Sequence, residues 1–465
     1  MVAALVIDNT GGEVDASGAS EAVSARPDAS EHAVQDDDRP RVGGDAACDH
    51  EIPSDMDEAD GTSNMSAVRP GDVVCLRAGP RAPLRLRNFH GERDAEITLI
   101  NSGGVVDVRG GTDDYAGIAI EDSDHIRVTG TGVASTCGAD HEEDQQRCGI
   151  RVLGSSRAVT GSVRTEYVQI DHVEMGDTTQ AGVSIRDNEL GRDEWVERGI
   201  VLRSNYLHDI EHEGMYIGSS SYESGDYHTL HGVEIGVNLV VRTGRDGIQV
   251  GSATRDCGIH GNVIRSSGRR GESEHGAGVM NNRGSVCDIY GNHVTDSAGW
   301  GIYVQGNGTN QIFNNVIVRS GVSSRSGNHH GDGIAIRDGS NQRNDIHVWN
   351  NTIVGAGGAG IGWSSRIGSD SEMSNNLVVG SGGDEIEEAP QVEVSHNLTY
   401  DDVSAVGFVD PARADYRLRA GSPAVDAGRD LSDAVVVVDD VDGTMRPQGA
   451  AYDVGAYEMP AGQAS

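Results

Sequence analysis

Two short stretches place an acidic residue directly before a glycine that opens an alternating apolar segment. They read EHEGMYIG (residues 211–218) and GRDGIQVG (residues 244–251), so that Glu213 and Asp246 lie 33 residues apart. Carboxylates act as general acids or bases, or bind a cation, and two of them at equivalent positions can act together. Whether these two meet in space depends on the repeat that carries them.

The glycine and the alternating residues after it recur along most of the chain. These G-hydrophobic-x-hydrophobic units begin at residues 117, 149, 182, 214, 247, 278, 301, 333 and 360. A second series consists of asparagines, most of which precede a short apolar segment: Asn205, Asn238, Asn262, Asn292, Asn315, Asn351, Asn376 and Asn397. A period of roughly 30 residues with two-residue alternation indicates a solenoid of short strands rather than of helices. We therefore predict an all-β chain that forms a parallel β-helix.

The parallel β-helix positions the two acids. Successive coils of such a solenoid stack about 4.8 Å apart, so Glu213 and Asp246 are expected about one coil apart on a rim. The recurring asparagines are expected to stack at one corner, because their amides can satisfy backbone groups of adjacent coils. The alternative for each acid is a structural one, in which its carboxylate only accepts turn N–H groups.

The asparagine turns and the G-I-x-V units together resemble the right-handed parallel β-helix superfamily, which includes pectate, alginate and chondroitin lyases and polygalacturonases. The resemblance covers about residues 70–400. The segment RPGDVVCLRAG (69–79) resembles the N-terminal cap of secreted bacterial β-helix proteins, and residues 415–458 resemble a short C-terminal module that often closes them. The resemblance implies a right-handed solenoid with an N-terminal cap and a small C-terminal capping module.

These features divide the chain into four predicted parts. Residues 1–45 contain few large apolar side chains and are predicted to be a disordered acidic leader. Residues 46–112 form the cap and the first coils, in which AEITLINSGGVVDV (95–108) is expected to make two short strands. Residues 113–400 carry the repeats. Residues 401–465 are expected to cap the last coil, and such modules are sometimes linked to surface anchoring.

Composition limits the partners and the compartment. Against 73 acidic residues stand 36 basic ones, all arginine, so the net charge is −37. Nucleic acid is an improbable partner, because binding phosphates needs a positive face. No apolar run approaches the ~18 residues of a membrane span, and the N-terminus is not a convincing signal peptide. We expect a secreted or cell-surface monomer.

The six cysteines suggest three sequential pairs, Cys48 with Cys75, Cys137 with Cys148, and Cys257 with Cys287. Disulfides would imply an oxidising compartment. Free buried thiols are the alternative.

In the families resembled, the sheet that carries the G-I-x-V units and its flanking loops form the substrate groove. Strand alternation places one residue of each unit outward, and Arg151 and Tyr216 are expected in this row. The candidate substrate-binding residues are Tyr216, Gln249, Asn282, Trp300, Tyr303 and Gln305. Aromatic rings stack on sugars, and amides bind hydroxyl groups. The candidate metal ligands, for Ca²⁺, are Glu213, Asp246 and Asp332.

Three functions remain open, of which a polysaccharide lyase that acts by β-elimination is favoured. A lyase needs a base and a group that neutralises the uronate carboxylate. The chain has no lysine, which excludes the variant of the lyases resembled that pairs Lys with Arg, so His or Tyr are the alternatives for the base. The leading bases are His212 and His275, with Arg245 or Arg337 as the neutraliser, and the loop residues His329 and His330 are expected beside them. A non-catalytic surface or glycan-binding β-helix is the alternative, and a glycoside hydrolase is the third choice.

Overall fold

The computed structural model describes residues 48–187, 191, 194–225, 227–321, 331–337, 344–364, 370–387, 390–432, 434 and 437–462. Residues Arg41–Ser465 form one compact unit. The predicted leader (1–45), His329 and His330 lie outside the described residues. Among the described residues, no helix has the length and apolar character needed to span a bilayer.

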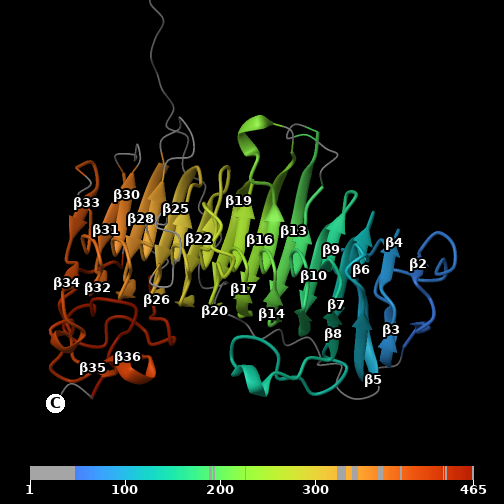
Figure 1. Ribbon diagram of the computed structural model, residues 1–465, viewed down its shortest axis with the longest axis horizontal. Coiled ribbons are helices and arrows are strands. Elements are labelled where there is room, and N and C mark those ends of the chain that lie inside the picture. Colours follow the sequence, from blue (N-terminus) through green and yellow to red (C-terminus); the bar gives the residue numbers. More distant parts are fainter. Residues whose placement is uncertain are drawn as a thin grey trace, which may run out of the picture. The chain divides into compact units, whose positions relative to one another are not determined.

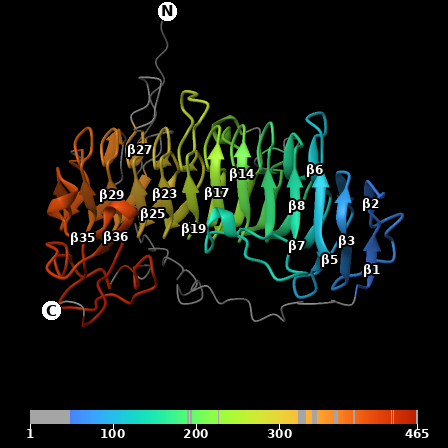
Figure 2. The same ribbon diagram turned by 60° about the horizontal axis from the view of Figure 1, so that its bottom comes forward.

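The front sheet is an 11-stranded parallel sheet to which each coil contributes one strand. Its strands are β2 (Glu58–Asp60), β4 (Leu84–Arg87), β6 (Ala116–Glu121), β9 (Arg157–Ser162), β12 (Val183–Ile185), β15 (Met215–Gly218), β18 (Ile248–Gly251), β21 (Val279–Asn281), β24 (Ile302–Val304), β27 (Ile334–Arg337) and β30 (Ile361–Ser364). Figures 1 and 2 show the coils side by side in chain order.

A 23-stranded sheet forms the other two sides of the coils. Its second stack contains β1 (His50–Ile52), β3 (Val73–Arg81), β5 (Ile97–Arg109), β7 (Asp124–Thr129), β10 (Glu166–Asp171), β13 (Val196–Arg203), β16 (Thr229–Gly236), β19 (Ala253–His260), β22 (Cys287–Tyr290), β25 (Gly308–Phe313), β28 (Asn344–Trp349), β31 (Glu372–Ser374) and β33 (Glu393–Ser395). Its third stack contains β8 (Ile150–Leu153), β11 (Val173–Gly176), β14 (Tyr206–Ile210), β17 (Leu239–Thr243), β20 (Val263–Arg265), β23 (His293–Thr295), β26 (Val316–Val318), β29 (Thr352–Val354), β32 (Leu377–Val379) and β34 (Leu398–Tyr400).

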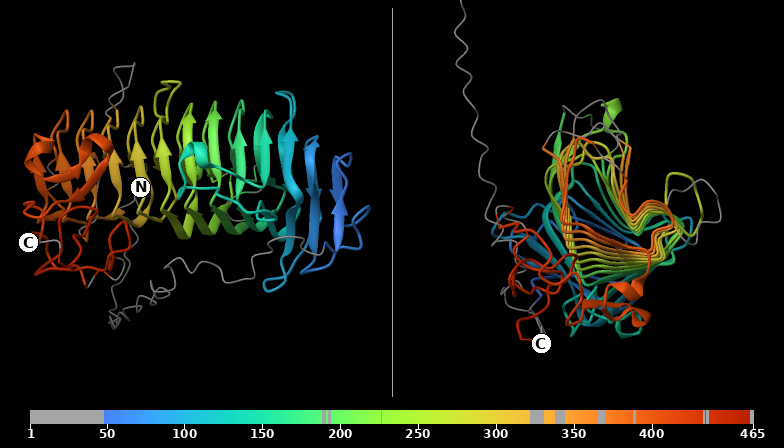
Figure 3. Two further views of the ribbon diagram at one scale, coloured as in Figure 1. Left: turned by 90° about the horizontal axis from the view of Figure 1, so that it is seen from below. Right: turned by 90° about the vertical axis from the view of Figure 1, so that its left-hand side faces the viewer.

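Each regular coil runs from the front sheet to the second stack, turns at an asparagine and returns along the third stack. All pairings between coils are parallel, as for Tyr216 with Gln249 and Val240 with Ile264. Inward residues such as Met215 and Ile235 are 0% exposed and fill the interior. The end-on view in Figure 3 shows successive coils superimposed around this interior. The predicted right-handed parallel β-helix is confirmed.

The predicted asparagine ladder is present and runs without interruption from Asn205 to Asn397. The Asn238 side chain donates through Nδ2 to Oδ1 of Asn262 and to the carbonyl of Leu202, both at 2.9 Å, and its backbone amide donates to the same Oδ1 at 3.0 Å. The same pattern recurs on the following coils. Each corner is therefore tied to its neighbours by side-chain amides.

Two sequence expectations about the early coils are wrong. The unit at residue 149 lies in β8, which pairs with β5 and β11 of the third stack, so Arg151 does not belong to the front sheet. The corresponding front strand is β9, which has no glycine at its start. The segment 95–108 does not form two short strands, because β5 continues through the corner and pairs along both stacks.

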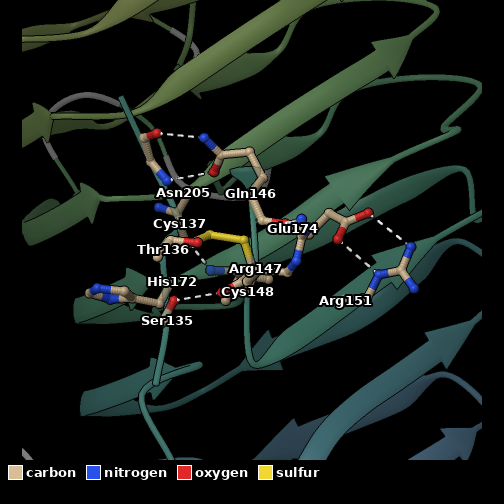
Figure 4. The surroundings of a disulfide bond; sticks show 12 residues. Ser135, Thr136, Cys137, Gln146, Arg147, Cys148, Arg151, His172, Glu174 and Asn205 are labelled. Atoms are coloured by element: carbon tan, nitrogen blue, oxygen red, sulfur yellow. Dashed lines mark hydrogen bonds and ion pairs between the residues drawn. A yellow bond between two sulfur atoms is a disulfide. The ribbon is translucent and has the colours of Figure 1, made fainter. Parts of the chain in front are cut away.

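An arm between β7 and β8 braces the outside of later coils. It is closed by the disulfide Cys137–Cys148, shown with its surroundings in Figure 4. Both cysteines pack on Tyr206, Leu239 and Val241 of the third stack. The Ala139 amide donates to the carbonyl of Val237 at 2.8 Å. The arm thus joins one coil to coils that follow it. The other disulfides are Cys48–Cys75 and Cys257–Cys287, so all three pairs are sequential.

The C-terminal module contains β35 (Phe408–Asp410), β36 (Asp415–Leu418) and the 3-10 turns η4 (Val403–Ala405) and η5 (Pro411–Arg413). Its apolar residues pack on outward side chains of β26, β29 and β32. Asn350, which precedes the ladder residue Asn351, donates to the carbonyls of Asp453 and Gly455. The module therefore lies along the flank of the last coils. The expectation that it caps the end of the solenoid needs this correction.

Candidate functional site

The residues just before the front-sheet strands form one column across the coils, called here the pre-strand column. The Gly214 amide donates to the carbonyl of Asp246, and the Gly247 amide to that of Ala277. The column contains, in order, Arg157, Ala181, Glu213, Asp246, Ala277, Trp300, Asp332 and Ala359. Glu213 and Asp246 are therefore neighbours one coil apart, as their spacing predicts.

A carboxylate pair and an imidazole form the centre of the site. Glu213, Asp246 and His275 each have a ligand atom within 4.8 Å of the others. Glu213 and Asp246 are 4% and 0% exposed, whereas the side chain of His275 is 29% exposed. Two buried acids thus lie beneath a histidine that reaches the surface.

Asp246 fixes the orientation of His275. Its Oδ1 accepts the amides of Gly276 and Ala277, each at 2.8 Å. Its Oδ2 lies 3.0 Å from Nδ1 of His275. This hydrogen bond raises the pKa of His275 above its ordinary value, although burial acts in the opposite direction. Because Nδ1 faces the buried carboxylate, the other ring nitrogen, Nε2, is left for a ligand.

Arg245 and His212 flank this centre. Arg245 donates to Glu272 at 2.7 Å and to Glu213 at 3.3 Å, so its guanidinium is already engaged by two carboxylates. Burial lowers the pKa of His212, and the charge of Arg245 acts in the same direction. His212 has no acidic partner comparable to Asp246. Of the two predicted bases, His275 is the one that the surrounding residues orient.

Asp332 and Arg337 belong to a different part of the front sheet. Asp332 follows Asp246 by three positions in the pre-strand column. Its Oδ2 accepts from Arg337 at 2.6 Å, and its Oδ1 accepts the Ala359 amide at 2.9 Å. The candidate ligand Asp332 therefore lies three coils from Asp246 and apart from the acid pair, and Arg337 is a partner of Asp332.

The predicted aromatic residues are packed against each other. The rings of Trp300 and Tyr303 stack with centroids 4.2 Å apart, and Trp300 is only 6% exposed. Gln305 donates to the Tyr303 hydroxyl at 2.7 Å. Trp300 is thus too buried to stack on a sugar ring, which was its predicted role, and its ring packs against that of Tyr303 instead. Burial also raises the pKa of Tyr303.

The remaining predicted residues lie between these two parts. Tyr216, Gln249, Met280 and Tyr303 occupy consecutive outward positions on β15, β18, β21 and β24. Gln249 is 2% exposed, and its Oε1 has no hydrogen-bond partner among the described residues. Asn282 follows β21, where its Oδ1 accepts the Arg283 amide. These four outward positions are therefore polar or aromatic except at Met280, which is 3% exposed and packs in an apolar cluster with Trp300.

The profile of a known family covers the part of the chain that contains this site. Residues 155–332 match the family described as "Periplasmic copper-binding protein (NosD)". The matched segment includes Glu213, Asp246 and His275 and lies entirely within the coils.

The chain folds as a parallel β-helix.

Several solved parallel β-helix structures are similar to this chain. An alginate lyase from Paenibacillus sp. str. FPU-7 has 15% identity, and the match covers 75% of this chain and 99% of the lyase, with a TM-score of 0.42. Pectate lyase Pel9A has 14% identity, coverages of 85% and 90%, and a TM-score of 0.42. The periplasmic alginate epimerase AlgG has 14% identity, coverages of 74% and 83%, and a TM-score of 0.37. No curated protein sequence matches this β-helix protein.

Two charged residues of the β-helix front, Glu272 and Arg157, were not predicted from the sequence. Glu272 completes the pairing of Arg245 from a loop that carries no repeat motif. Arg157 and Arg186 lie on β9 and next to β12, beside Tyr115 and Tyr216. The glycine motif at residue 149 looks like the front strand of this coil, but the front strand is β9, which begins at Arg157. A count of coil positions back from Glu213 would have found it.

Proposed function

We propose that this protein acts outside the cytoplasm on an acidic polysaccharide and cleaves it by β-elimination on the front sheet. The glycan lies along the row of outward residues, and the reacting sugar lies against His275. Three disulfides support an oxidising compartment. The matched family is described as periplasmic, and the similar solved structures are named as alginate and pectate lyases and an alginate epimerase.

One observation carries the proposal, the hydrogen bond between buried Asp246 and partly exposed His275. A general base must be oriented and must reach the proton that it removes. Asp246 is held by two backbone amides and holds Nδ1 in turn, which directs Nε2 toward the glycan side.

In this proposal Nε2 of neutral His275 takes the proton on C5 of a uronate residue. The electron pair forms the C4–C5 double bond, the C4–O bond breaks, and the departing oxygen takes a proton from water. Arg245 is the nearest cation available to the uronate carboxylate, and it exchanges part of its pairing with Glu213 for that carboxylate. Asp246 keeps the imidazole oriented and stabilises its charged form.

The direct test is the ultraviolet absorbance of the unsaturated product, with polyuronates, glycosaminoglycans and neutral glycans as substrates. We expect absorbance to rise with at least one acidic polymer and the H275A variant to lose this activity. H212A is the matched control, since His212 lies in the same loop region without an orienting acid, and it should keep most of the rate. Equal loss in both variants, or no product from any acidic polymer, would contradict the proposal.

A second candidate function is metal binding at the same group. The predicted Ca²⁺ fits poorly, because it favours a shell of six to eight oxygens, whereas the oxygens here already accept amide, imidazole and guanidinium hydrogen bonds. One imidazole and two carboxylates within 4.8 Å better suit a first-row transition ion. The family description mentions copper. Calorimetric titration with Cu²⁺, Zn²⁺ and Ca²⁺ tests both ions, and H275A should abolish only transition-metal binding.

A glycan-binding role without cleavage is the remaining alternative, and Tyr216 and Tyr303 on the same outward row favour it. It predicts that the protein binds a glycan that it leaves intact. A glycoside hydrolase is less well supported, because Asp246 is fully buried and bonded to two amides. Mass analysis of the products separates these outcomes.

A further inference from the structure

Among the described residues, no carboxylate forms an ion pair with either of two arginines on the front of the early coils. The guanidinium of Arg157 lies 4.8 Å from the ring centroid of Tyr115, and that of Arg186 lies 4.7 Å from the ring centroid of Tyr216. Neither forms an ion pair within the part of the chain that the structure describes, whereas Arg127, Arg151, Arg242 and Arg245 all do. In a chain of net charge −37, two such arginines on neighbouring coils are unusual.

The coil register places the two arginines on neighbouring coils at opposite ends of the front strands, with Arg157 in line with the acid pair. Arg157 occupies the pre-strand column two coils before Glu213, with the small Ala181 between them. Arg186 directly follows β12, on the coil between β9 and β15. Burial lowers the pKa of Arg157, and the nearby charge of Arg186 acts in the same direction. The positive charges of the two arginines therefore disfavour each other.

The acids in this region are committed elsewhere. Asp114 accepts the Gly111 amide, and Asp187 accepts the Arg164 amide. Glu121 pairs with Arg85 and Arg87 at 3.4 and 3.2 Å. The carboxylate whose charge acts on Arg157 is that of Glu213, which hydrogen-bonds Arg245.

The floor beneath the arginines contains buried polar atoms without partners. Thr160 on β9 and Gln249 on β18 are each 2% exposed, and both Thr160 Oγ1 and Gln249 Oε1 have no hydrogen-bond partner among the described residues. They occupy the same outward row, with Ser184 and Tyr216 between them. Buried polar groups are normally hydrogen-bonded, so unpartnered ones on a binding face indicate a ligand that supplies the missing bonds.

We propose that Arg157 and Arg186 form an anion subsite that binds a carboxylate or sulfate group of an acidic glycan, on a sugar three to four coils before the one at His275. The Thr160 hydroxyl and the Gln249 carbonyl bind hydroxyl groups along the same row. This proposal rests on the proposed function only for the placement of the glycan on the front sheet. Binding can be measured whether or not the glycan is cleaved.

The experiment measures binding of the full chain to polygalacturonate, dextran sulfate and neutral dextran by calorimetry at one fixed ionic strength. The variants are R157Q, R186Q and T160V. The matched control is R198Q, which removes the same charge from β13, on the same coil as Arg186 but on the second stack, where Arg198 lies 3.7 Å from Glu166. Circular dichroism and thermal unfolding check that each variant is folded, and T160V remains informative if an arginine variant is not.

We expect R157Q and R186Q each to weaken binding to an anionic polymer by at least about tenfold, because charge-assisted hydrogen bonds are among the strong ones. R198Q should bind like the unaltered chain, and T160V should bind more weakly by a smaller factor. The polymer whose binding depends on the arginines identifies the anion as carboxylate or sulfate.

The subsite is overturned if R157Q and R186Q bind like R198Q, or if the unaltered chain binds neither anionic polymer. Cleavage is scored separately in the same samples. If binding depends on the arginines but no polymer is cleaved, the lyase proposal fails and the subsite stands. If a polymer is cleaved and KM is the same in R157Q, R186Q and the unaltered chain, the subsite fails and the lyase proposal stands.

Discussion

At the scale of single residues, Asp246 serves both the fold and the candidate site. Its Oδ1 closes the turn of the next coil by accepting two amides, and its Oδ2 is the partner of His275. A turn-bonding acid and a catalytic partner are usually alternatives, but here one carboxylate is both. The position of His275 is therefore fixed by the same atoms that hold two coils together.

The D246N variant tests this dual role through pH dependence. The amide oxygen can still accept the two backbone amides, but the negative charge that raises the pKa of His275 is lost. Since a base must be deprotonated, activity falls as the pH drops through this pKa. We expect the acid limb of kcat/KM to lie above the ordinary histidine pKa of about 6.5 in the unaltered chain and to move to lower pH in D246N. An NMR titration of His275 should show the same shift. An acid limb that stays in place would mean that another group titrates.

Some of the site residues could be predicted from sequence and others could not. The acids before glycine were identifiable because the repeat gives them equivalent positions in successive coils. The position of Arg157 could not be predicted, because strands of all three stacks show the same alternation of inward apolar residues. The segment GIRV at 149 therefore has the sequence pattern of a front strand although it lies in the third stack. The burial of Trp300 beneath Tyr303 also depends on the rotamers of neighbouring coils, which a repeat motif does not specify.

At the scale of structural elements, the asparagine ladder determines where each coil turns. Every interior member is buried and both accepts from one neighbour and donates to the next. The ladder was predictable because asparagine tolerates tight corners and recurs with the period of the coils. The docking of the C-terminal module on the flank was not, because its apolar residues would suit either the end or the side of the solenoid.

The ladder predicts a position-dependent cost for asparagine removal. N262A removes the acceptor of the Asn238 backbone and side-chain amides and the donor to the Ile235 carbonyl, whereas Oδ1 of Asn292 keeps the backbone amide of residue 262. Because an unsatisfied buried group costs roughly 1–3 kcal/mol, we expect about 3 kcal/mol less unfolding free energy. N397A is the control, since Asn397 ends the ladder and is only half-buried, so water should limit its loss to about 1 kcal/mol. Urea denaturation measures both. Equal losses would show that the ladder does not act through burial.

At the scale of the whole molecule, the main electrostatic feature is a large excess of negative charge. The chain carries 73 acidic and 36 basic residues. Net charge far from zero favours solubility but destabilises the folded state through self-repulsion. The coils bring charges that are distant in sequence to within one strand spacing of each other, so this repulsion is stronger in the folded chain than in the unfolded one.

Salt should therefore stabilise this protein. Screening shortens the range of repulsion between exposed charges to about 3 Å at 1 M ionic strength. We expect Tm to rise by several degrees between low and molar KCl at neutral pH. At a pH near the sequence pI of 4.6, where the net charge is small, the same salt increase should have much less effect. A Tm that is insensitive to KCl at neutral pH would show that the arginine pairs already compensate for the charge.

Because the C-terminal module is attached to the side of the solenoid, the number of coils is free to change during evolution. The module binds through corners at Asn314, Asn350 and Asn375, each of which directly precedes a ladder asparagine. Duplication of a coil upstream of Asn314 would lengthen the front sheet by about 4.8 Å and leave these contacts intact. Relatives of this protein are thus expected to differ in coil number before the Asn314-Asn315 doublet and to keep a constant number after it. Substrate length and structural closure would then evolve independently.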